Sequence, residues 1–308
     1  MINVSKKTMC VAVGGFALAC AALLSPAGSS DAAAQKYKFA MITHGQPGDT
    51  FWDIIRKGAA AAAAKDDVQL IYLADPTASK EAQLVTNAVA QHVDGIALTL
   101  AFPDAMASAV KQAQAAGIPV VGFNAGVDNW KQAGLLMYVG QDETIAGEAV
   151  GDRLNAEVSK SAICVDQQQG AVQLEERCDG IKKTFHGDLF VLYVTGYDMA
   201  AAQSRIVAKL QQNPGTDYIV TLGAPFAPVA IAAAGMAGSH AKVGTFDLTP
   251  RATSLIQQGT LQWAVDLLWL NITNGDVVGG GQPVLTGPTF VTKDNVDVVA
   301  KFANQGTR

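Results

Sequence analysis

Polar and aromatic side chains follow several apolar runs of this chain, at positions where they could bind a small molecule. The stretch from Tyr37 to Trp52 starts as an apolar run, continues as a Gly/Pro-rich polar loop with Asp49, and ends in the adjacent aromatics Phe51 and Trp52. Three more candidates border later predicted elements: Asn124, Arg177 and Asp247. Aromatic rings offer flat apolar faces, while carboxylates, amides and guanidinium groups form directional hydrogen bonds. This mixture suits a polyhydroxylated ligand such as a sugar.

The chain lacks the short motifs that mark common catalytic sites. It has no G-x-S-x-G elbow, no H-E-x-x-H, no P-loop and no G-x-G-x-x-G after the first predicted strand. The four histidines are scattered, and none has a partner at metal-ligand spacing. We therefore expect no enzymatic activity, no metal and no cofactor. An exported hydrolase that uses Asp247 and His44 is kept as an alternative, and His44 and Gln46 could also reach a pocket from the first loop.

Strand-like and helix-like segments alternate along the chain, which predicts parallel sheets with helical crossovers. The first series has strands at 37–43, 68–74, 95–99 and 119–124, with helices at 51–65 and 104–116. The pattern restarts after residues 139–142, with a helix at 144–158 and strands at 162–166, 189–194, 218–222, 243–247 and 261–265. Two such series predict an α/β protein with two lobes. In open α/β sheets, ligands bind beyond the carboxyl ends of the strands.

The N-terminal segment has the composition of a secretion signal. Lys6 and Lys7 precede an apolar run, and an Ala-x-Ala pattern predicts cleavage after Ala34. An uncleaved anchor is disfavoured because the run is shorter than the roughly 20 residues that span a bilayer. Lipid attachment at Cys20 is a further alternative. The formal net charge of -5 argues against nucleic-acid binding, which normally requires a basic face.

Two cysteines lie outside the predicted signal. Cys164 falls in a predicted strand and Cys178 in the next predicted helix. Two thiols in an oxidising compartment favour a disulfide, and adjacent elements could bring them within bridging range. Two buried free thiols are the alternative.

Several segments together resemble a known family. They are the opening strand and aromatic pair with residues 56–59, and the segments 94–97, 116–121, 175–180 and 244–247. In this order and spacing, the chain resembles the exported sugar-binding proteins of ATP-driven (ABC) importers, of the ribose-binding, type I periplasmic class. The resemblance implies two doubly wound parallel-sheet lobes joined by three hinge crossings, near Gln141, Asp266 and Thr286. It predicts a signal peptide at 1–34, a first lobe at 35–141 plus 267–285, and a second lobe at 142–266 plus 286–308.

The resemblance also implies roles for the candidate residues of the first lobe. Asp49 falls where the family often has an asparagine that contacts the sugar. Phe51 and Trp52 fall where paired aromatics sandwich the ring, and Asn124 matches a residue that binds hydroxyls. The alternative for the two aromatics is that they merely cover the sheet.

In the second lobe, Arg177 matches an arginine that binds ring and hydroxyl oxygens, and Asp247 an aspartate that accepts hydroxyl hydrogens. The alternatives are that Arg177 pairs with Glu175 or Glu176, and that Asp247 caps a helix or turn. The chain departs from the family at Gly223 and Ala224, where many relatives have polar side chains. It also lacks the family's glutamine-containing segment after Asp266, where we predict a short helix at 267–274.

The resemblance also implies an activity. The protein would capture a small sugar or polyol, close its lobes by hinge motion, and deliver the ligand outside the cytoplasm to the membrane permease of an ABC importer, acting as a monomer. Reporting the ligand to a chemoreceptor or sensor kinase is the alternative. The sequence leaves pentoses, hexoses, cyclitols and furanosyl compounds open as ligands.

Overall fold

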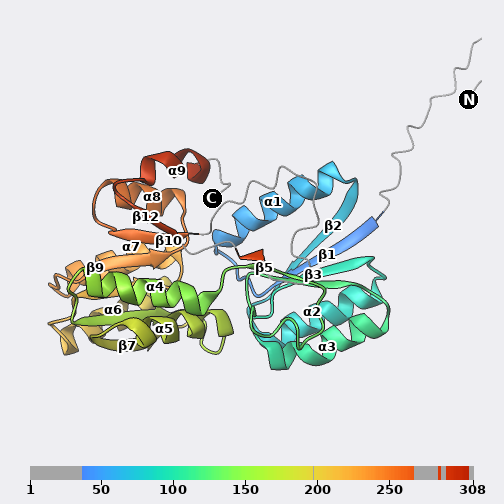
Figure 1. Cartoon of the computed structure of the whole chain (residues 1–308), viewed down its shortest axis with the longest axis horizontal. Coiled ribbons are helices and arrows are strands. Elements are labelled where there is room, and N and C mark those ends of the chain that lie inside the picture. Colours follow the sequence, from blue (N-terminus) through green and yellow to red (C-terminus); the bar gives the residue numbers. More distant parts are fainter. Residues whose placement is uncertain (1–36, 197, 267–283, 286–288, 305–308) are drawn as a thin grey trace, which may run out of the picture. The chain divides into compact units, whose positions relative to one another are not determined.

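The computed structural model describes residues 37–196, 198–266, 284–285 and 289–304. In this part of the chain, strands and helices alternate, and the strands form two separate sheets (Figure 1). The predicted fold class, α/β with parallel sheets in two lobes, is confirmed. None of the helices within the described ranges is both long and apolar enough to cross a membrane.

The first sheet has the strand order β11-β5-β4-β3-β1-β2, with every neighbouring pair parallel. Its strands are β1 (Tyr37–Thr43), β2 (Val68–Ala74), β3 (Gly95–Leu98), β4 (Val120–Phe123), β5 (Tyr138–Gly140) and β11 (Val284–Leu285). The helices α1 (Phe51–Lys65), α2 (Ala78–Ala90) and α3 (Pro103–Ala115) connect them. Figure 1 shows α1 on one face of the sheet and α2 and α3 on the other. We call these elements the first lobe.

The second sheet has the order β12-β10-β9-β8-β6-β7. Its strands are β6 (Ser161–Asp166), β7 (Asp188–Tyr193), β8 (Tyr218–Thr221), β9 (Lys242–Phe246), β10 (Trp263–Asp266) and β12 (Thr289–Thr292). Its helices are α4 (Glu143–Ala156), α5 (Val172–Thr184), α6 (Met199–Gln212), α7 (Ala227–Met236), α8 (Pro250–Gln257) and α9 (Val296–Asn304), with a 3-10 turn at Ala224–Phe226. The edge strand β12 is antiparallel to β10, which the sequence did not predict. We call these elements the second lobe.

Alternating side chains of β6 face two different layers of the second lobe. Ile163 and Val165 pack in the core beneath α6, α7 and α8, while Ala162 and Cys164 pack in the core beneath α4 and α5. This period of two is the geometry of a strand buried on both faces. Packing on both faces therefore holds the carboxyl end of β6 between the two helix layers of the second lobe.

The chain passes between the sheets near the predicted crossings. β5 belongs to the first sheet and α4 to the second lobe, and the chain returns to the first sheet at β11 and to the second at β12. The exact lobe boundaries remain predictions. The predicted signal peptide, Cys20 and the predicted helix at 267–274 lie outside the described residues.

The two helices that flank the second-lobe part of the pocket described below pack unusually closely. A Cβ atom added to Gly147 of α4 would lie 2.3 Å from the Arg177 carbonyl oxygen, and one added to Gly180 of α5 would lie 2.3 Å from the Thr144 carbonyl oxygen. Only glycine allows this approach. It brings the start of α4 against the middle of α5, where Arg177 lies.

The predicted disulfide is confirmed. Cys164 of β6 is bonded to Cys178 of α5, and both residues are buried. The bond therefore fixes α5 to the sheet one residue after Arg177.

Candidate functional site

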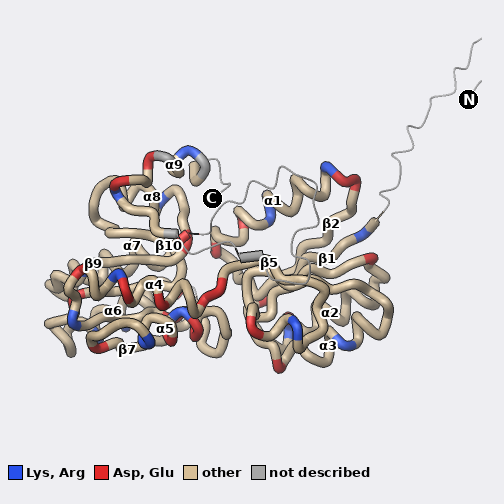
Figure 2. The backbone as a smooth tube through the Cα atoms, viewed as in Figure 1, with Lys and Arg blue, Asp and Glu red and all other residues tan. Residues whose placement is uncertain are grey.

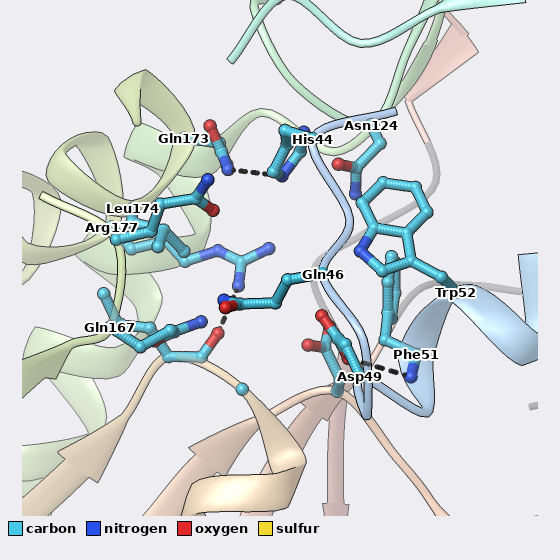
Figure 3. A pocket seen from close by; sticks show the side chains of 14 residues that line it. His44, Gln46, Asp49, Phe51, Trp52, Asn124, Gln167, Gln173, Leu174 and Arg177 are labelled. Carbon is cyan, nitrogen blue, oxygen red and sulfur yellow. Dashed lines mark hydrogen bonds between the residues drawn. The ribbon is translucent and has the colours of Figure 1, made fainter. Parts of the chain in front are cut away.

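All six predicted ligand-binding residues line one pocket at the carboxyl ends of strands from both sheets (Figure 3). The pocket encloses about 480 Å³ of space, part of which is open to solvent. Asp49, Phe51, Trp52 and Asn124 come from the first lobe, and Arg177 and Asp247 from the second. Eight further residues line it: His44, Gln46, Gln167, Gln168, Gln173, Leu174, Leu222 and Gly223.

Phe51 and Trp52 open helix α1 and meet edge to face, with ring centroids 5.1 Å apart. Trp52 is only 4% exposed and also packs edge to face on His44 and Phe123. A Cβ on Gly45 would lie 2.7 Å from the indole, so the loop can pass Trp52 only because residue 45 is glycine. Trp52 thus packs against other residues of the first lobe and also borders the pocket.

Asp49 lies in the loop before α1. Its Oδ1 accepts a hydrogen bond of 3.1 Å from the Phe51 backbone N–H. This N–H belongs to the first turn of the helix, where backbone N–H groups have no acceptor within the helix itself. A carboxylate in this position is stabilised by the positive end of the helix dipole. The loop therefore holds a negative charge at the rim of the pocket.

Asn124 and Asp247 both have a left-handed backbone, with φ angles of 65° and 67°. The sequence predicted them as the last residues of strands, but this conformation ends β4 and β9 one residue earlier. Asp247 does not cap the following helix, because the Thr249 side chain accepts the hydrogen bond from the Ala252 N–H there. Burial raises the pKa of Asp247 to about 7, with Arg177 acting in the opposite direction and the carboxylates of Asp49, Glu143 and Asp266 adding to the rise.

Arg177 is paired with Glu143 of α4, and not with Glu175 or Glu176 as the sequence alternative proposed. Its Nε donates to Glu143 Oε2 at 2.6 Å and its Nη2 to Oε1 at 3.0 Å, while Nη1 donates to the Leu222 carbonyl at 2.8 Å. Burial disfavours the guanidinium charge, but Glu143 and then Asp247 hold the pKa of Arg177 above its ordinary value. The guanidinium also lies 4.5 Å from the centre of the Phe246 ring.

Glu143 also ties the arginine to the first crossing between the lobes. The Gln141 side-chain Nε2 donates to Glu143 Oε2 at 2.7 Å. Gln141 and Glu143 are both almost fully buried. The crossing segment and the arginine therefore share one buried carboxylate.

His44 lies in a buried hydrogen-bonded chain that runs between the lobes. Its Nε2 is 2.9 Å from Gln173 Nε2 of α5, and its Nδ1 is 2.9 Å from Thr99 Oγ1, which donates to Glu81 Oε1 at 2.6 Å. With the Gln173 amide as assigned, His44 Nε2 accepts and Nδ1 carries the proton. Burial, and then Arg177, lower the pKa of His44 to about 3. Both ring nitrogens are engaged, so His44 is poorly suited to the base role of the hydrolase alternative.

Two more hydrogen bonds join the lobes beside the pocket. The Val172 backbone N–H donates to the Ala101 carbonyl at 2.9 Å, and Gln168 Nε2 donates to the Pro76 carbonyl at 3.0 Å. Both donors belong to the segment from the end of β6 to the start of α5. This segment therefore holds the second lobe against the first at one side of the pocket.

The sequence interpretation missed Gln167, Gln168, Gln173 and Glu143. The first two belong to a run of three glutamines directly after β6, so the same strand-end rule that selected Asn124 could have found them. Gln167 also bears on the departure at Gly223, because a Cβ added there would lie 3.2 Å from Gln167 Nε2. An amide from the neighbouring strand end thus stands beside the position where the family resemblance leads us to expect a polar side chain. No group of three or more potential metal ligands occurs in the described part of the chain.

The fold and this two-sided pocket define a class of solute-binding proteins. The sequence profile of the family described as periplasmic binding protein domain matches residues 39–267. The chain belongs to this family, whose members act outside the cytoplasm.

Individual relatives agree with this assignment. A carbohydrate transporter protein of Acidothermus cellulolyticus, solved in complex with myo-inositol, is 55% identical; the alignment covers 88% of this chain and 99% of that one, with a TM-score of 0.84. An ABC transporter solute-binding protein of Burkholderia graminis, solved with D-arabinose, is 25% identical, with coverages of 85% and 97% and a TM-score of 0.71. These relatives are binding proteins rather than enzymes.

A curated relative matches over a shorter part of the chain. The xylose/arabinose-binding protein of Sulfolobus acidocaldarius is 25% identical over 197 residues, which are 58% of this chain and 49% of that protein. The match therefore spans about half the length of that relative.

Proposed function

We propose that this protein captures a cyclic polyol, with myo-inositol as the first candidate, and delivers it to the membrane permease of an ABC importer. The observation that carries the proposal is the 55% identity, over 88% of the chain, to a structure that holds myo-inositol. We also propose that the N-terminal segment is a cleaved export signal and that the protein acts as a monomer.

The chemistry of the pocket supports a ligand with hydroxyl groups around a ring. Phe51 and Trp52 offer apolar surface to the C–H groups of such a ring, while Asn124, Arg177 and Asp247 offer donors and acceptors to its hydroxyls. Pockets of this kind take their orientation from a few polar groups and their contact area from apolar ones. In this proposal the six residues bind the ligand directly.

A thermal-shift screen tests the ligand class. The purified protein is heated with myo-inositol, scyllo-inositol, D-arabinose, D-glucose and D-ribose. A ligand present at 100 times its dissociation constant should stabilise the protein by about 2.7 kcal/mol. We expect the largest shift with an inositol, and the recovered ligand should be chemically unchanged.

A matched pair of aromatic substitutions tests the site. Phe51→Ala removes a ring at the pocket, whereas Phe190→Ala removes a half-exposed ring from β7, outside it. The shift with inositol should be lost in the first variant and kept in the second. Equal shifts in both variants would remove Phe51 from the proposed site.

A further inference from the structure

Gln46 lines the pocket, and a tight turn fixes where its side chain starts. Its backbone carbonyl accepts a hydrogen bond of 3.2 Å from the Asp49 N–H, which closes a four-residue turn. Pro47 and Gly48 form the middle of this turn, and Gly48 has a φ angle of 88°. Proline followed by a residue with a positive φ angle is the signature of a type II turn. The loop before α1 therefore holds the Gln46 backbone in one position beside the pocket.

The Gln46 side chain extends from the first lobe to the second. Figure 3 shows its amide pointing from the loop into the pocket, toward the second-lobe residues. A Cβ atom added to Gly196 would lie 2.9 Å from Gln46 Oε1. Gly196 belongs to the loop between β7 and α6, and its N–H donates at 3.0 Å to the carbonyl of Gln167, another residue that lines the pocket. Gln46 thus reaches the second-lobe wall of the pocket.

A larger residue at position 196 would displace the Gln46 amide. The φ angle of Gly196 is 46°, in the left-handed region that glycine adopts without cost. A Cβ atom 2.9 Å from Gln46 Oε1 is closer than van der Waals contact, so the end of the Gln46 side chain would have to move. Gly196 therefore leaves the space that the amide occupies.

The Gln46 amide is available to a ligand. The residue is half-buried, and within the described ranges no hydrogen bond or ion pair involves its side chain. An amide has two N–H donors and a carbonyl acceptor, so a hydroxyl group can pair with either end of it. Because a polar group that is removed from water without a partner is costly, this amide favours a ligand that brings a hydroxyl to it.

We propose that Gln46 is a specificity-determining residue: its amide binds one hydroxyl of the ring, and its side chain fills the space in which a substituent on that hydroxyl would lie. This inference rests on the proposed function for the recognition of the ring itself. A ring with a free hydroxyl at this position gains the hydrogen bond, whereas a ring with a methyl or glycosyl group there loses the bond and must displace the side chain. Such a clash with the wrong ligand is one of the two ways in which binding proteins discriminate. The pocket therefore selects a ring that is unsubstituted at this position.

Calorimetric titration of the native protein and of Gln46→Ala tests this selection. The probes are myo-inositol and its mono-O-methyl ethers, one for each ring position. We expect Gln46→Ala to bind myo-inositol about tenfold more weakly, because the hydrogen bond is lost. It should also bind at least one ether about tenfold more tightly than the native protein does, because the space for the methyl group is open. Gln211→Ala, at an exposed position of α6, is the matched control and should leave all these affinities unchanged.

A double-variant cycle tests the position of the amide at the second lobe. Gly196→Ala should push the amide aside and weaken the binding of myo-inositol about tenfold. In the Gln46→Ala background the same substitution should have a clearly smaller effect, because no amide remains to be displaced. Gly238→Ala, with a φ angle of 62° and no neighbouring atom near the added Cβ, measures the effect of a left-handed alanine alone. None of these substitutions changes the charged residues drawn in Figure 2, so a change in affinity reports the contact and not the charge.

The outcomes separate this inference from the proposed function. If myo-inositol binds, but Gln46→Ala changes its affinity and those of all the ethers by the same factor, the inference is wrong and the proposed function stands. An equal effect of Gly196→Ala in both backgrounds also overturns the inference, because the amide then lies elsewhere. Gln46→Ser is the second variant should Gln46→Ala fail to fold, since serine is common in turns and opens the same space. If none of the ring compounds binds to folded native protein, the proposed function fails and the inference fails with it.

Discussion

Asn124 and Asp247 occupy corresponding places in the two sheets. Each follows the fourth strand of its βα series, has a φ angle near 65°, and donates its backbone N–H to a carbonyl of the next strand: Asn124 to Val139 at 2.9 Å and Asp247 to Val265 at 2.8 Å. A left-handed backbone disfavours most residues but is tolerated best by glycine, asparagine and aspartate. The pocket thus takes one polar side chain from the same structural position of each lobe.

The backbone at residue 124 allows side-chain and backbone effects to be separated. Asn124→Gly keeps the left-handed conformation without strain but removes the amide. We expect the affinity for inositol to fall about tenfold, or roughly 1.4 kcal/mol, while the free energy of unfolding changes by less than about 1 kcal/mol. Asn124→Ala should lose the same affinity and, in addition, about 1 kcal/mol of stability. Calorimetry and urea unfolding measure the two quantities, and native affinity in the glycine variant would contradict the role of the amide.

The Arg177–Glu143 pair predicts that a double variant regains most of the stability that a single variant loses. Glu143→Gln leaves a buried guanidinium without its charged partner, which should cost about 3 to 5 kcal/mol. Replacing both residues, as in Arg177→Met with Glu143→Leu, removes the unpaired charge and should restore most of that stability. The double variant should not bind inositol. Urea unfolding of the single and double variants checks this. If the double variant lost as much free energy of unfolding as the two single substitutions added together, that result would argue against a buried ion pair.

The disulfide predicts a loss of stability with little loss of affinity. The bonded cysteines are 14 residues apart, and closing a loop of that size stabilises a protein by about 3 kcal/mol. Replacing Cys164 and Cys178 by alanine should remove that amount. Because α5 is also held by its close packing on α4, the affinity for inositol should change by less than about threefold, or roughly 0.6 kcal/mol. A reducing agent applied to the native protein provides the matched control, and a much larger loss of affinity would show that the bond itself positions Arg177.

The buried carboxyl of Glu81 predicts a pH dependence of stability. Burial raises its pKa to about 8 from an ordinary value of 4.5, with the Thr99 hydrogen bond acting in the opposite direction. Between these pH values the folded state binds a proton that the unfolded state has lost, so the free energy of unfolding falls as the pH rises.

Glu81→Gln isolates this contribution. The variant should match the native protein near pH 5 and exceed its stability above about pH 8, by on the order of a few kcal/mol. The comparison needs urea unfolding from about pH 5 to about pH 9. Parallel profiles for the two proteins would contradict a neutral, buried Glu81.

The sequence could predict which residues approach the pocket, because apolar runs locate the strands and ligands bind beyond their carboxyl ends. Asp49, Asn124 and Asp247 all follow strands and all line the pocket. The disulfide could also be predicted, since its two cysteines fall in consecutive elements.

The partners of the site residues could not be predicted in the same way. Arg177 has two glutamates directly before it in the chain, yet it pairs with Glu143, 34 residues away. That choice depends on the close approach of α4 and α5 that Gly147 and Gly180 permit, which is a property of packing and not of spacing. The buried position of His44 could not be predicted either, because its partners Thr99 and Gln173 come from two other elements.

Calorimetric titration of the purified protein with myo-inositol tests the central claim most directly. The proposed function predicts saturable binding at one site per chain, with a dissociation constant below about 10 µM, or roughly -7 kcal/mol. Absence of binding heat and of thermal stabilisation at millimolar inositol, with folded protein, would contradict it.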